Sequence, residues 1–356
     1  MNKILSAIVA MLTALSVSAQ CNCPRYAIDK VRDLVLIYQG GTHRIDWTKD
    51  DFKPYVSHVF ANGKREWTFD GFLFLELHDG TGKHYAPMFG APKPNQQDWQ
   101  IYLDRLYAKD KGLDALDKCI GELKKEIGDP GFKHKVTLMI PTPMADSVAW
   151  GKINGKTIDF NKLEDRIAGA EWFIDQIVGR FYKNKYKNLE LTGLYWLDED
   201  MCHTADFPKH IAPKVHSLGL EFVWIPYFKA RGYERWRELG FDIAYHQPNH
   251  FFDKNIPDSR LDEACDYALA NGMAMEFECD ANAVFQKEDS SYSRMEAYID
   301  AFMRQHVFST SAIAYYTGSK LFIDMVNNPC PENQRIMDKL MRIIVERRAY
   351  KCLEPK

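Results

Sequence analysis

Residues 193–200 read GLYWLDED, residues 272–280 read GMAMEFECD and residues 70–78 read DGFLFLELH. In each stretch a short apolar run follows a glycine and ends in acidic residues. Short apolar runs that follow a turn residue are typical of buried β-strands. The three stretches therefore predict strands whose final residues carry carboxyl groups.

Five further apolar runs bring the number of predicted strands to eight. The predicted strands cover residues 34–38, 72–75, 136–140, 191–197, 222–225, 243–245, 273–277 and 312–316. A first helix is expected after Thr48, which with Asp51 matches an N-cap and its partner. Further helical patterns cover residues 99–127, 163–182, 208–217, 233–239, 258–270, 292–306 and 332–348.

This alternation of strands and helices predicts an α/β fold with a parallel sheet. Eight such units in a chain of 356 residues match a (β/α)8 TIM barrel. A doubly wound open sheet is the second choice, but no GxGxxG or GxxxxGK[ST] motif follows the first strand to support it. No internal repeat or linker is visible, so we expect a single domain.

The composition excludes several classes of protein. With 46 Lys+Arg against 49 Asp+Glu, the net charge is −3, which leaves no basic excess to neutralise nucleic-acid phosphates. A hydrophobic content of 46% is enough for a large core and argues against intrinsic disorder.

The N-terminus predicts export. Lys3, a short apolar run and then Val17-Ser18-Ala19 match a signal peptide over residues 1–19, which leaves residues 20–356 as the mature barrel with its C-terminal helix. The run is too short to span a bilayer comfortably, so a membrane anchor is the less favoured alternative. A lipoprotein anchored through Cys21 is a second alternative, although Gln20 is not the small residue expected before a lipidated cysteine. No later segment is apolar enough to cross a membrane, and we expect a periplasmic or extracellular protein.

Eight cysteines in the mature part permit disulfides in an exported protein, and we expect some bridges. Their spacing carries no zinc signature, and no cofactor or metal is predicted. His78, His203, His246 and His250 near strand ends are interpreted as hydroxyl contacts or surface residues.

The acidic residues at the strand ends predict a catalytic site. Strand alternation places Glu276 and Glu278 on the face that points into the barrel, opposite Phe277. Glu199 and Glu278 each lie six residues past a glycine, which puts both at the barrel mouth with Glu276 one layer deeper. Two carboxylates at the mouth of a barrel suit glycoside hydrolysis, in which one protonates the leaving oxygen and the other attacks or activates water. Structural ion pairs with Arg or Lys are one alternative. Calcium binding is another, and Asp198, Glu199 and Asp200 beside His203 are the candidate cation site.

The placement resembles that of the clan A glycoside hydrolases, which are retaining TIM-barrel enzymes with an acid/base Glu after strand four and a nucleophilic Glu after strand seven. The resemblance implies that Glu199 is the acid/base and Glu278 the nucleophile. Many clan members have Asn where this chain has Asp198. Glu276, Asp198 and Glu76 are the alternative catalytic acids.

The mature chain also resembles an uncharacterised family of secreted bacterial TIM-barrel proteins. The matching segments are LIYQGG at 36–41, FDGFLF at 69–74, GLYWL at 193–197 with Glu199, WIPYF at 224–228 and QPN at 247–249. This resemblance implies the fold and export rather than a substrate.

Aromatic and amide side chains near the strand ends are candidates for sugar binding, because rings stack on sugar faces and amides bind hydroxyls. These candidates are Trp196, Trp224, Tyr227, Gln247, Asn249 and Trp150. For Trp196 or Trp224 alone a place in the core is the better interpretation. Long loops at 79–98 and 144–159 are expected to wall a cleft.

The sequence therefore predicts a secreted glycoside hydrolase that acts on a complex glycan, and the clan A resemblance implies a retaining reaction. A non-catalytic carbohydrate-binding barrel is the first alternative. A metal-dependent hydrolase or a lyase on the same scaffold is the second. The expected partner is a carbohydrate, and no protein partner is indicated.

Overall fold

The computed structural model describes residues 26–87, 92–285, 289–350 and 353. Eight parallel strands close into a barrel in the order β1-β12-β11-β10-β9-β8-β5-β4. Their bounds are β1 Asp33–Tyr38, β4 Gly71–Leu75, β5 His134–Ile140, β8 Leu189–Trp196, β9 Glu221–Trp224, β10 Ile243–His246, β11 Ala274–Glu278 and β12 Ile313–Tyr316. The predicted (β/α)8 barrel and all eight predicted strands are confirmed.

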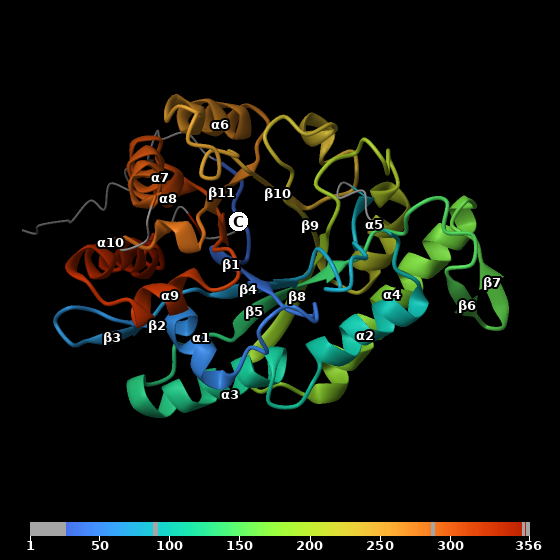
Figure 1. The fold of residues 1–356 in the computed structure, drawn as a ribbon, viewed down its shortest axis with the longest axis horizontal. Helices are drawn as coiled ribbons and strands as arrows, with labels where there is room; N and C mark the ends of the chain where they lie inside the picture. Colours follow the sequence, from blue (N-terminus) through green and yellow to red (C-terminus); the bar gives the residue numbers. More distant parts are fainter. Residues whose placement is uncertain (1–25, 88–91, 286–288, 351–352, 354–356) are drawn as a thin grey trace, which may run out of the picture.

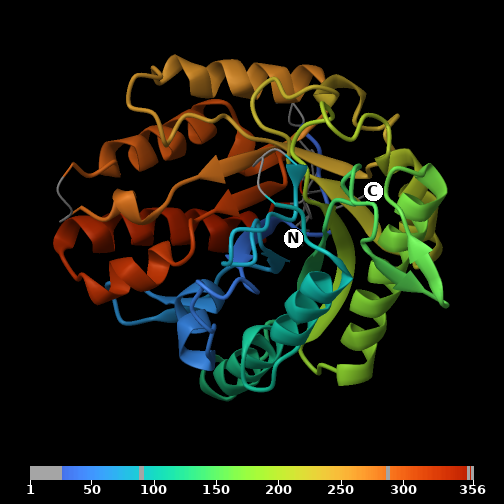
Figure 2. The same cartoon turned by 45° about the vertical axis from the view of Figure 1, so that its right-hand side comes forward.

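Helices surround the barrel on its outer side (Figures 1 and 2). Their bounds are α1 Lys49–Val56, α2 Gln96–Leu106, α3 Gly112–Ile127, α4 Leu163–Asn184, α5 Pro208–Ser217, α6 Ser259–Ala270, α7 Tyr292–Arg304, α8 Val307–Thr310, α9 Leu321–Asn327 and α10 Pro331–Arg347. The predicted start of α1 is confirmed, since Asp51 accepts a hydrogen bond of 2.8 Å from the backbone N–H of Thr48.

Two helix predictions are wrong. The amphipathic stretch at 99–127 is two helices rather than one, because Asp110 and Gly112 adopt positive φ angles of 62° and 46° that break the helical path. The stretch at 233–239 forms only a 3₁₀ turn at Tyr233–Arg235, between Gly232 and Gly240, which both have positive φ. The positive φ of the two glycines bounds the helical segment on both sides.

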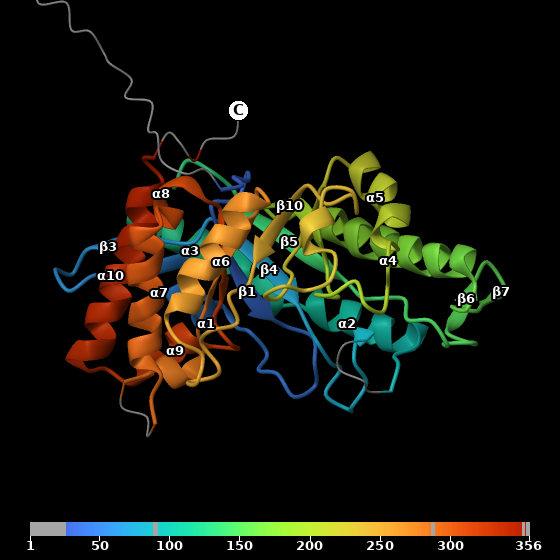
Figure 3. The same ribbon diagram turned by 90° about the horizontal axis from the view of Figure 1, so that it is seen from above.

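Two hairpins, which were not predicted, project from opposite sides of the barrel (Figures 1 and 3). The first joins β2 Ser57–Val59 to β3 Arg65–Trp67, and the second joins β6 Gly151–Ile153 to β7 Lys156–Ile158.

The barrel strands are buried on both faces. Their sequences are nearly continuous apolar runs, because both faces contact the protein interior. On β11 the predicted alternation is confirmed. Phe277 points outward and packs on Tyr298 and Phe302 of α7, with ring centroids 5.1 and 5.8 Å apart. Glu276 and Glu278 point to the opposite side, into the barrel.

The five cysteines that the structure describes are free thiols: Cys119, Cys202, Cys265, Cys279 and Cys330. Cys119, Cys265 and Cys279 are buried. The expectation of some disulfide bridges stays a prediction for the other three cysteines. Cys21, Cys23, Cys352 and the predicted signal peptide at 1–19 lie outside the described residues. Within the described ranges, no helix combines the length and hydropathy needed to span a bilayer.

Candidate active site

A cavity of about 260 Å³ opens at the carboxyl ends of the barrel strands. Every barrel strand except β5 contributes to its lining, either by its last residues or by those that follow it. The lining residues are Leu36, Tyr38, Leu75, Leu77, Tyr195, Glu199, Ile225, Gln247, Phe252, Glu276, Glu278 and Tyr316. Active sites of TIM barrels lie at this face, because the loops that follow the strands converge there. The structure brings Glu199, Glu276, Glu278 and Gln247 together, as the strand-end reasoning predicted.

Glu199 enters the cavity three residues after the end of β8, on the same side of the chain as Tyr195. Desolvation in the cavity is the main cause that raises its pKa, to about 8. A hydrogen bond from Gln247 opposes this shift, while the nearby charges of Glu278 and Asp198 add to it. This shift favours the protonated form of Glu199 at neutral pH, and in that form it can donate a proton.

Glu278 ends β11 and is 1% exposed. Desolvation raises its pKa to about 7, but several donors stabilise its anionic form. The Tyr298 hydroxyl on α7 donates a short hydrogen bond to its Oε2, and the backbone N–H of His250 donates another at 3.4 Å. The positive charge of Arg260 lowers the pKa further. Glu278 is thus the more easily ionised of the two mouth carboxyls.

Glu276 lies two residues deeper on the same strand and is 2% exposed. Among the described residues no group hydrogen-bonds its carboxyl, and burial together with Glu278 and Glu199 raises its pKa well above the ordinary range. It is a third acid that faces the cavity without a protein partner.

Glu76, an alternative catalytic acid, has a structural role instead. Arg44 binds both of its oxygens, Nε to Oε2 at 2.9 Å and Nη2 to Oε1 at 3.0 Å. The backbone N–H groups of Gly41 and Leu77 donate to the same carboxylate at 3.1 and 2.9 Å. A Cβ on Gly41 would lie 2.4 Å from His43 Cε1 and 2.7 Å from Glu76 Oε2, so a larger residue there would displace one of these side chains. The carboxylate is saturated and ties the loop after β1 to the end of β4.

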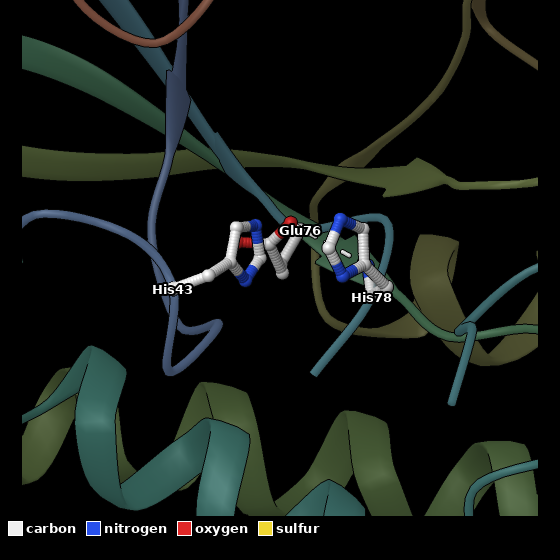
Figure 4. A group of neighbouring side chains, drawn as sticks. All are labelled: His43, Glu76 and His78. Atoms are coloured by element: carbon white, nitrogen blue, oxygen red, sulfur yellow. Dashed lines mark hydrogen bonds between the residues drawn. The ribbon is translucent and has the colours of Figure 1, made fainter. Parts of the chain in front are cut away.

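Beside this carboxylate, the imidazole rings of His43 and His78 stack with centroids 4.0 Å apart and planes 10° apart (Figure 4). Donor atoms of His43, Glu76 and His78 lie within 4.8 Å of one another, a spacing that could hold a metal ion. The residues fit a metal poorly, however, because Arg44 already occupies both oxygens of Glu76. The lone pairs of the two stacked rings also lie in two nearly parallel planes, which do not meet at one metal position.

Asp198, the other alternative acid, is fully buried outside the cavity lining. Its Oδ2 accepts a hydrogen bond of 3.1 Å from the Thr204 hydroxyl, and burial raises its pKa to about 7. Because it neighbours Glu199 in an extended segment, its side chain points the other way. It shapes the loop after β8 rather than facing a ligand.

Almost the whole barrel matches a known protein family. A family model described as "Domain of unknown function (DUF4855)" matches residues 33–342. The chain belongs to the DUF4855 family. No curated protein matches it.

Among solved structures, the DUF4855 barrel is similar to other barrels at very low identity. The catalytic domain of a family GH18 chitinase from the fern Peteris ryukyuensis is 8% identical with a TM-score of 0.44, over 88% of this chain and 99% of that one. A mutant tryptophan synthase α-subunit (D110N) from Pyrococcus furiosus is 8% identical at TM-score 0.38, over 88% and 98%. Rubisco from Pyrococcus horikoshii is 9% identical at TM-score 0.40, over 89% and 60%. Similarity at this level concerns the fold and carries no conclusion about chemistry.

The predicted stacking platforms of the DUF4855 chain are core residues. Trp196 is fully buried and packs on Phe207, at a centroid distance of 5.8 Å. Trp224 is also fully buried; it stacks on Phe241 at 5.1 Å, and its Nε1 donates to the backbone oxygen of Asp198 at 2.8 Å. On the strands both indoles alternate with cavity residues and face outward.

Trp150 does not lie at the cavity either. It is 2% exposed and packs against Trp99, Phe160 and Trp172, with centroid distances of 4.8, 4.9 and 5.6 Å. The loop at 144–159 that carries it folds back as the β6–β7 hairpin, and Gln96 at the start of α2 donates its backbone N–H to the Trp150 oxygen. No described residue of the 79–98 and 144–159 loops lines this cavity. Residues 88–91 lie outside the described residues, and the role of these loops as cleft walls stays a prediction.

Of the remaining candidates, Gln247 lines the cavity, where its Nε2 donates to the Ile225 oxygen at 2.9 Å. Asn249 instead supports it from behind, since its Nδ2 donates to Gln247 Oε1 at 3.3 Å. Tyr227 donates its hydroxyl to Asp200 outside the cavity. The side-chain amides of Gln247 and Asn249 are hydrogen-bonded to each other, and Gln247 is the one that faces the cavity.

Sequence reasoning missed the aromatic wall of this DUF4855 site. Tyr38, Tyr195, Phe252 and Tyr316 line the cavity, and Tyr298 supports Glu278 from α7. Alternation from Glu199 back to Tyr195 was a usable signal, because residues four apart on an extended chain share a side. No signal pointed to Phe252, which comes from the loop after β10, or to Tyr298, which comes from a helix.

Proposed function

We propose that this protein is a glycoside hydrolase that cleaves a glycan by acid–base catalysis at the barrel mouth. The observation that carries the proposal is the pair Glu199 and Glu278, on β8 and β11, which face one cavity in different environments. Glycoside hydrolysis uses two carboxyls, one protonated and one ionised. Pairs of titratable groups whose surroundings separate their pKa values mark such acid and base roles.

The roles follow from the hydrogen bonds. Glu199 has the higher pKa and acts as the general acid that protonates the leaving oxygen. Glu278 acts as the nucleophile, since Tyr298 and the backbone N–H of His250 stabilise its negative charge. Glu276 lacks such donors and lies deeper, which makes it the weaker candidate for the nucleophile.

The clan A resemblance of this layout supports a retaining reaction. Glu278 attacks the anomeric carbon and forms a glycosyl-enzyme, while the leaving-group oxygen takes the proton of Glu199. Glu199 then removes a proton from water, which attacks the anomeric carbon and restores the free Glu278 carboxylate. NMR of the first-formed anomer tests the stereochemistry, and an inverted product contradicts a nucleophilic Glu278.

The predicted signal peptide supports action outside the cytoplasm, on glycans of the surroundings. Export is tested by locating the full-length protein in fractions of the expressing cell. Residence in the cytoplasm would contradict this part of the proposal.

The first experiment measures sugar release from a broad panel of polysaccharides and aryl glycosides. Wild type is compared with Glu199→Gln, Glu278→Gln and a control, Glu190→Gln, which changes an exposed acid at the opposite end of β8. We expect hydrolysis by wild type and the control. Both active-site variants should lose about 10²-fold or more on substrates with poor leaving groups.

Leaving-group dependence separates the two roles. A phenol of low pKa departs without protonation, so the first step of Glu199→Gln should recover on a dinitrophenyl glycoside. This recovery appears as a rapid burst of dinitrophenol followed by slow turnover, because the variant still lacks the base for the second step. Glu278→Gln should give no burst. Unchanged hydrolysis in both variants would contradict the site. Saturable glycan binding with no turnover on any substrate would favour the non-catalytic barrel instead.

A further inference from the structure

The cavity combines three acids with a complete lack of basic lining residues. Glu199, Glu276 and Glu278 face it, and none of the described residues that line it is Lys, Arg or His. The nearby guanidinium of Arg44 is committed to both oxygens of Glu76. That of Arg260 stacks over the Phe228 ring at 4.0 Å and reaches Glu278 only through its field.

Glu276 is the acid of this cavity that is most available to hydrogen-bond a ligand. Its carboxyl is almost completely buried, has no protein hydrogen-bond partner among the described residues and borders the cavity. A buried polar group without a partner is costly, and a ligand group that hydrogen-bonds it recovers that cost. The floor of the cavity therefore presents an acceptor, or a carboxylic acid donor, to whatever enters.

The size of the cavity limits what enters. At about 260 Å³ it is smaller than the roughly 300–1,000 Å³ of pockets that enclose drug-sized ligands. One sugar ring fits such a volume, and further rings of a glycan lie outside it. The rings of Tyr38, Tyr195, Phe252 and Tyr316 supply flat walls for the apolar faces of that ring.

The spacing of the acids disfavours a bare metal ion as the occupant. Metal–oxygen bonds of about 2.0–2.6 Å require donor atoms within roughly 5 Å of one another. Within the described ranges, only His43, Glu76 and His78 bring three such donors within 4.8 Å, so the three cavity glutamates are more widely spread. Hydroxyl and ammonium groups hydrogen-bond at about 2.7–3.2 Å and can join acceptors that are farther apart.

We infer that the cavity takes one sugar residue that carries no negative charge, either a neutral or an amino sugar, and rejects uronic acids and sulfated sugars. The inference rests on the proposed function, because it specifies the sugar bound at that site. A ligand carboxylate or sulfate would be buried beside Glu278, the most easily ionised of the three acids, with no cation in the lining to pair it. That costs far more than a hydroxyl in the same place. An ammonium group would pair with the Glu278 anion, and it would favour ionisation of Glu199 and Glu276 beside it.

Binding of monosaccharides to the full-length protein tests this charge preference and requires no hydrolysis. Isothermal titration compares probes of one stereochemistry that differ in charge: glucosamine, glucose and glucuronic acid, and likewise galactosamine, galactose and galacturonic acid. In the series that binds, we expect the uronic acid to be at least about tenfold weaker than the neutral sugar. The amino sugar should bind at least as tightly as the neutral one.

Glu276→Gln assigns the preference to the floor of the cavity, since it removes a carboxyl and keeps the shape. This variant should reduce the affinity ratio of amino sugar to uronic acid by about threefold or more, whereas Glu190→Gln should leave the ratio unchanged. A uronic acid that binds wild type as well as the neutral sugar would overturn the inference. So would the absence of binding by every probe in both series.

These results are distinguishable from the fate of the proposed function. If charge discrimination is found but no glycan is ever hydrolysed, the ligand class stands and the hydrolase proposal fails. If wild type hydrolyses uronides in preference to neutral glycosides, the hydrolase proposal stands and the ligand class fails.

Discussion

At the level of single residues, hydrogen-bond donors distinguish two glutamates that look alike in sequence. Both follow apolar runs and both are desolvated at one cavity. Tyr298 and the backbone N–H of His250 donate to Glu278, whereas among the described residues Glu199 has only the amide of Gln247 as a donor. Donors to the anion lower a carboxyl pKa, and this difference assigns the acid and the nucleophile.

The pH dependence of hydrolysis should report these two groups. Glu278 must be ionised, which requires a pH above about 7, and Glu199 must be protonated, which requires a pH below about 8. The profile of kcat/KM against pH should therefore be a narrow bell between these values. The two apparent pKa values of the profile belong to the coupled pair of carboxyls. A broad optimum at pH 4–5 would contradict the assignment.

Tyr298→Phe sharpens this test. Loss of the hydroxyl removes a donor from the Glu278 anion, so the pKa of Glu278 should rise. Its other charged neighbours, Glu276, Glu199 and Arg260, are unchanged. The acidic limb of kcat/KM should move to higher pH while the alkaline limb stays in place.

A matched control for this variant is Tyr315→Phe. The Tyr315 hydroxyl donates to Asp33 at 2.7 Å, at the amino-terminal end of the barrel and away from the cavity. Both limbs should be unchanged in this variant. A shift of the acidic limb in Tyr315→Phe, or none in Tyr298→Phe, would refute the role given to Tyr298.

At the level of elements, local side chains decide where helices start. Asn95 caps α2, since its Oδ1 accepts hydrogen bonds from the backbone N–H groups of Gln97 and Asp98 at 2.9 and 3.1 Å. Asp98 returns a bond by accepting from the backbone N–H of Asn95 at 2.7 Å. This capping box begins α2 just before Trp99, where the apolar pattern begins.

Asn95→Ala should lower the free energy of unfolding by about 1 kcal/mol, because two N–H groups at the start of α2 lose their acceptor. Asn95→Ser, which keeps a capping oxygen, should stay close to wild type. Urea unfolding midpoints measure both variants. Equal loss in the two variants would show that packing of Asn95 matters rather than its cap.

At the level of the whole molecule, one buried arginine joins the last helix to the amino-terminal end of the barrel. Arg347 of α10 is fully buried, and its Nε donates to Asp33 Oδ1 at 2.9 Å at the start of β1. Its Nη2 donates to the backbone oxygens of Ser311 and Arg32 at 2.9 and 3.1 Å. The guanidinium thus ties β1, α10 and the segment before β12 together.

Arg347→Met should destabilise the protein by about 3–5 kcal/mol, because it leaves the buried Asp33 carboxylate without its cation. The matched control is Arg335→Met on the same helix, whose exposed ion pair with Glu296 should contribute at most about 1 kcal/mol. Chemical denaturation compares the two. Similar losses in both variants would contradict a special role for the buried pair.

Much of the barrel was predictable, because periodicity and turn residues act over a few neighbouring residues. The runs at 34–38, 72–75 and 273–277 lie within a residue of the observed strands β1, β4 and β11. The break between α2 and α3 was not predicted, since the amphipathic pattern continues across Asp110 and Gly112 while the backbone turns. The hairpins were missed because their strands are only three residues long.

Sequence alone determined the number of barrel strands, the alternation on β11 and the convergence of Glu199 and Glu278 at one end of the barrel. These follow from local patterning and from the rule that parallel strands end together. Only the tertiary structure decided which residues surround those acids: Trp196 and Trp224 pack into the core, Arg44 saturates Glu76, and Tyr298 reaches Glu278 from another element. Desolvation, ion pairing and hydrogen bonding between distant segments depend on packing across the barrel, and no local pattern in the chain specifies them.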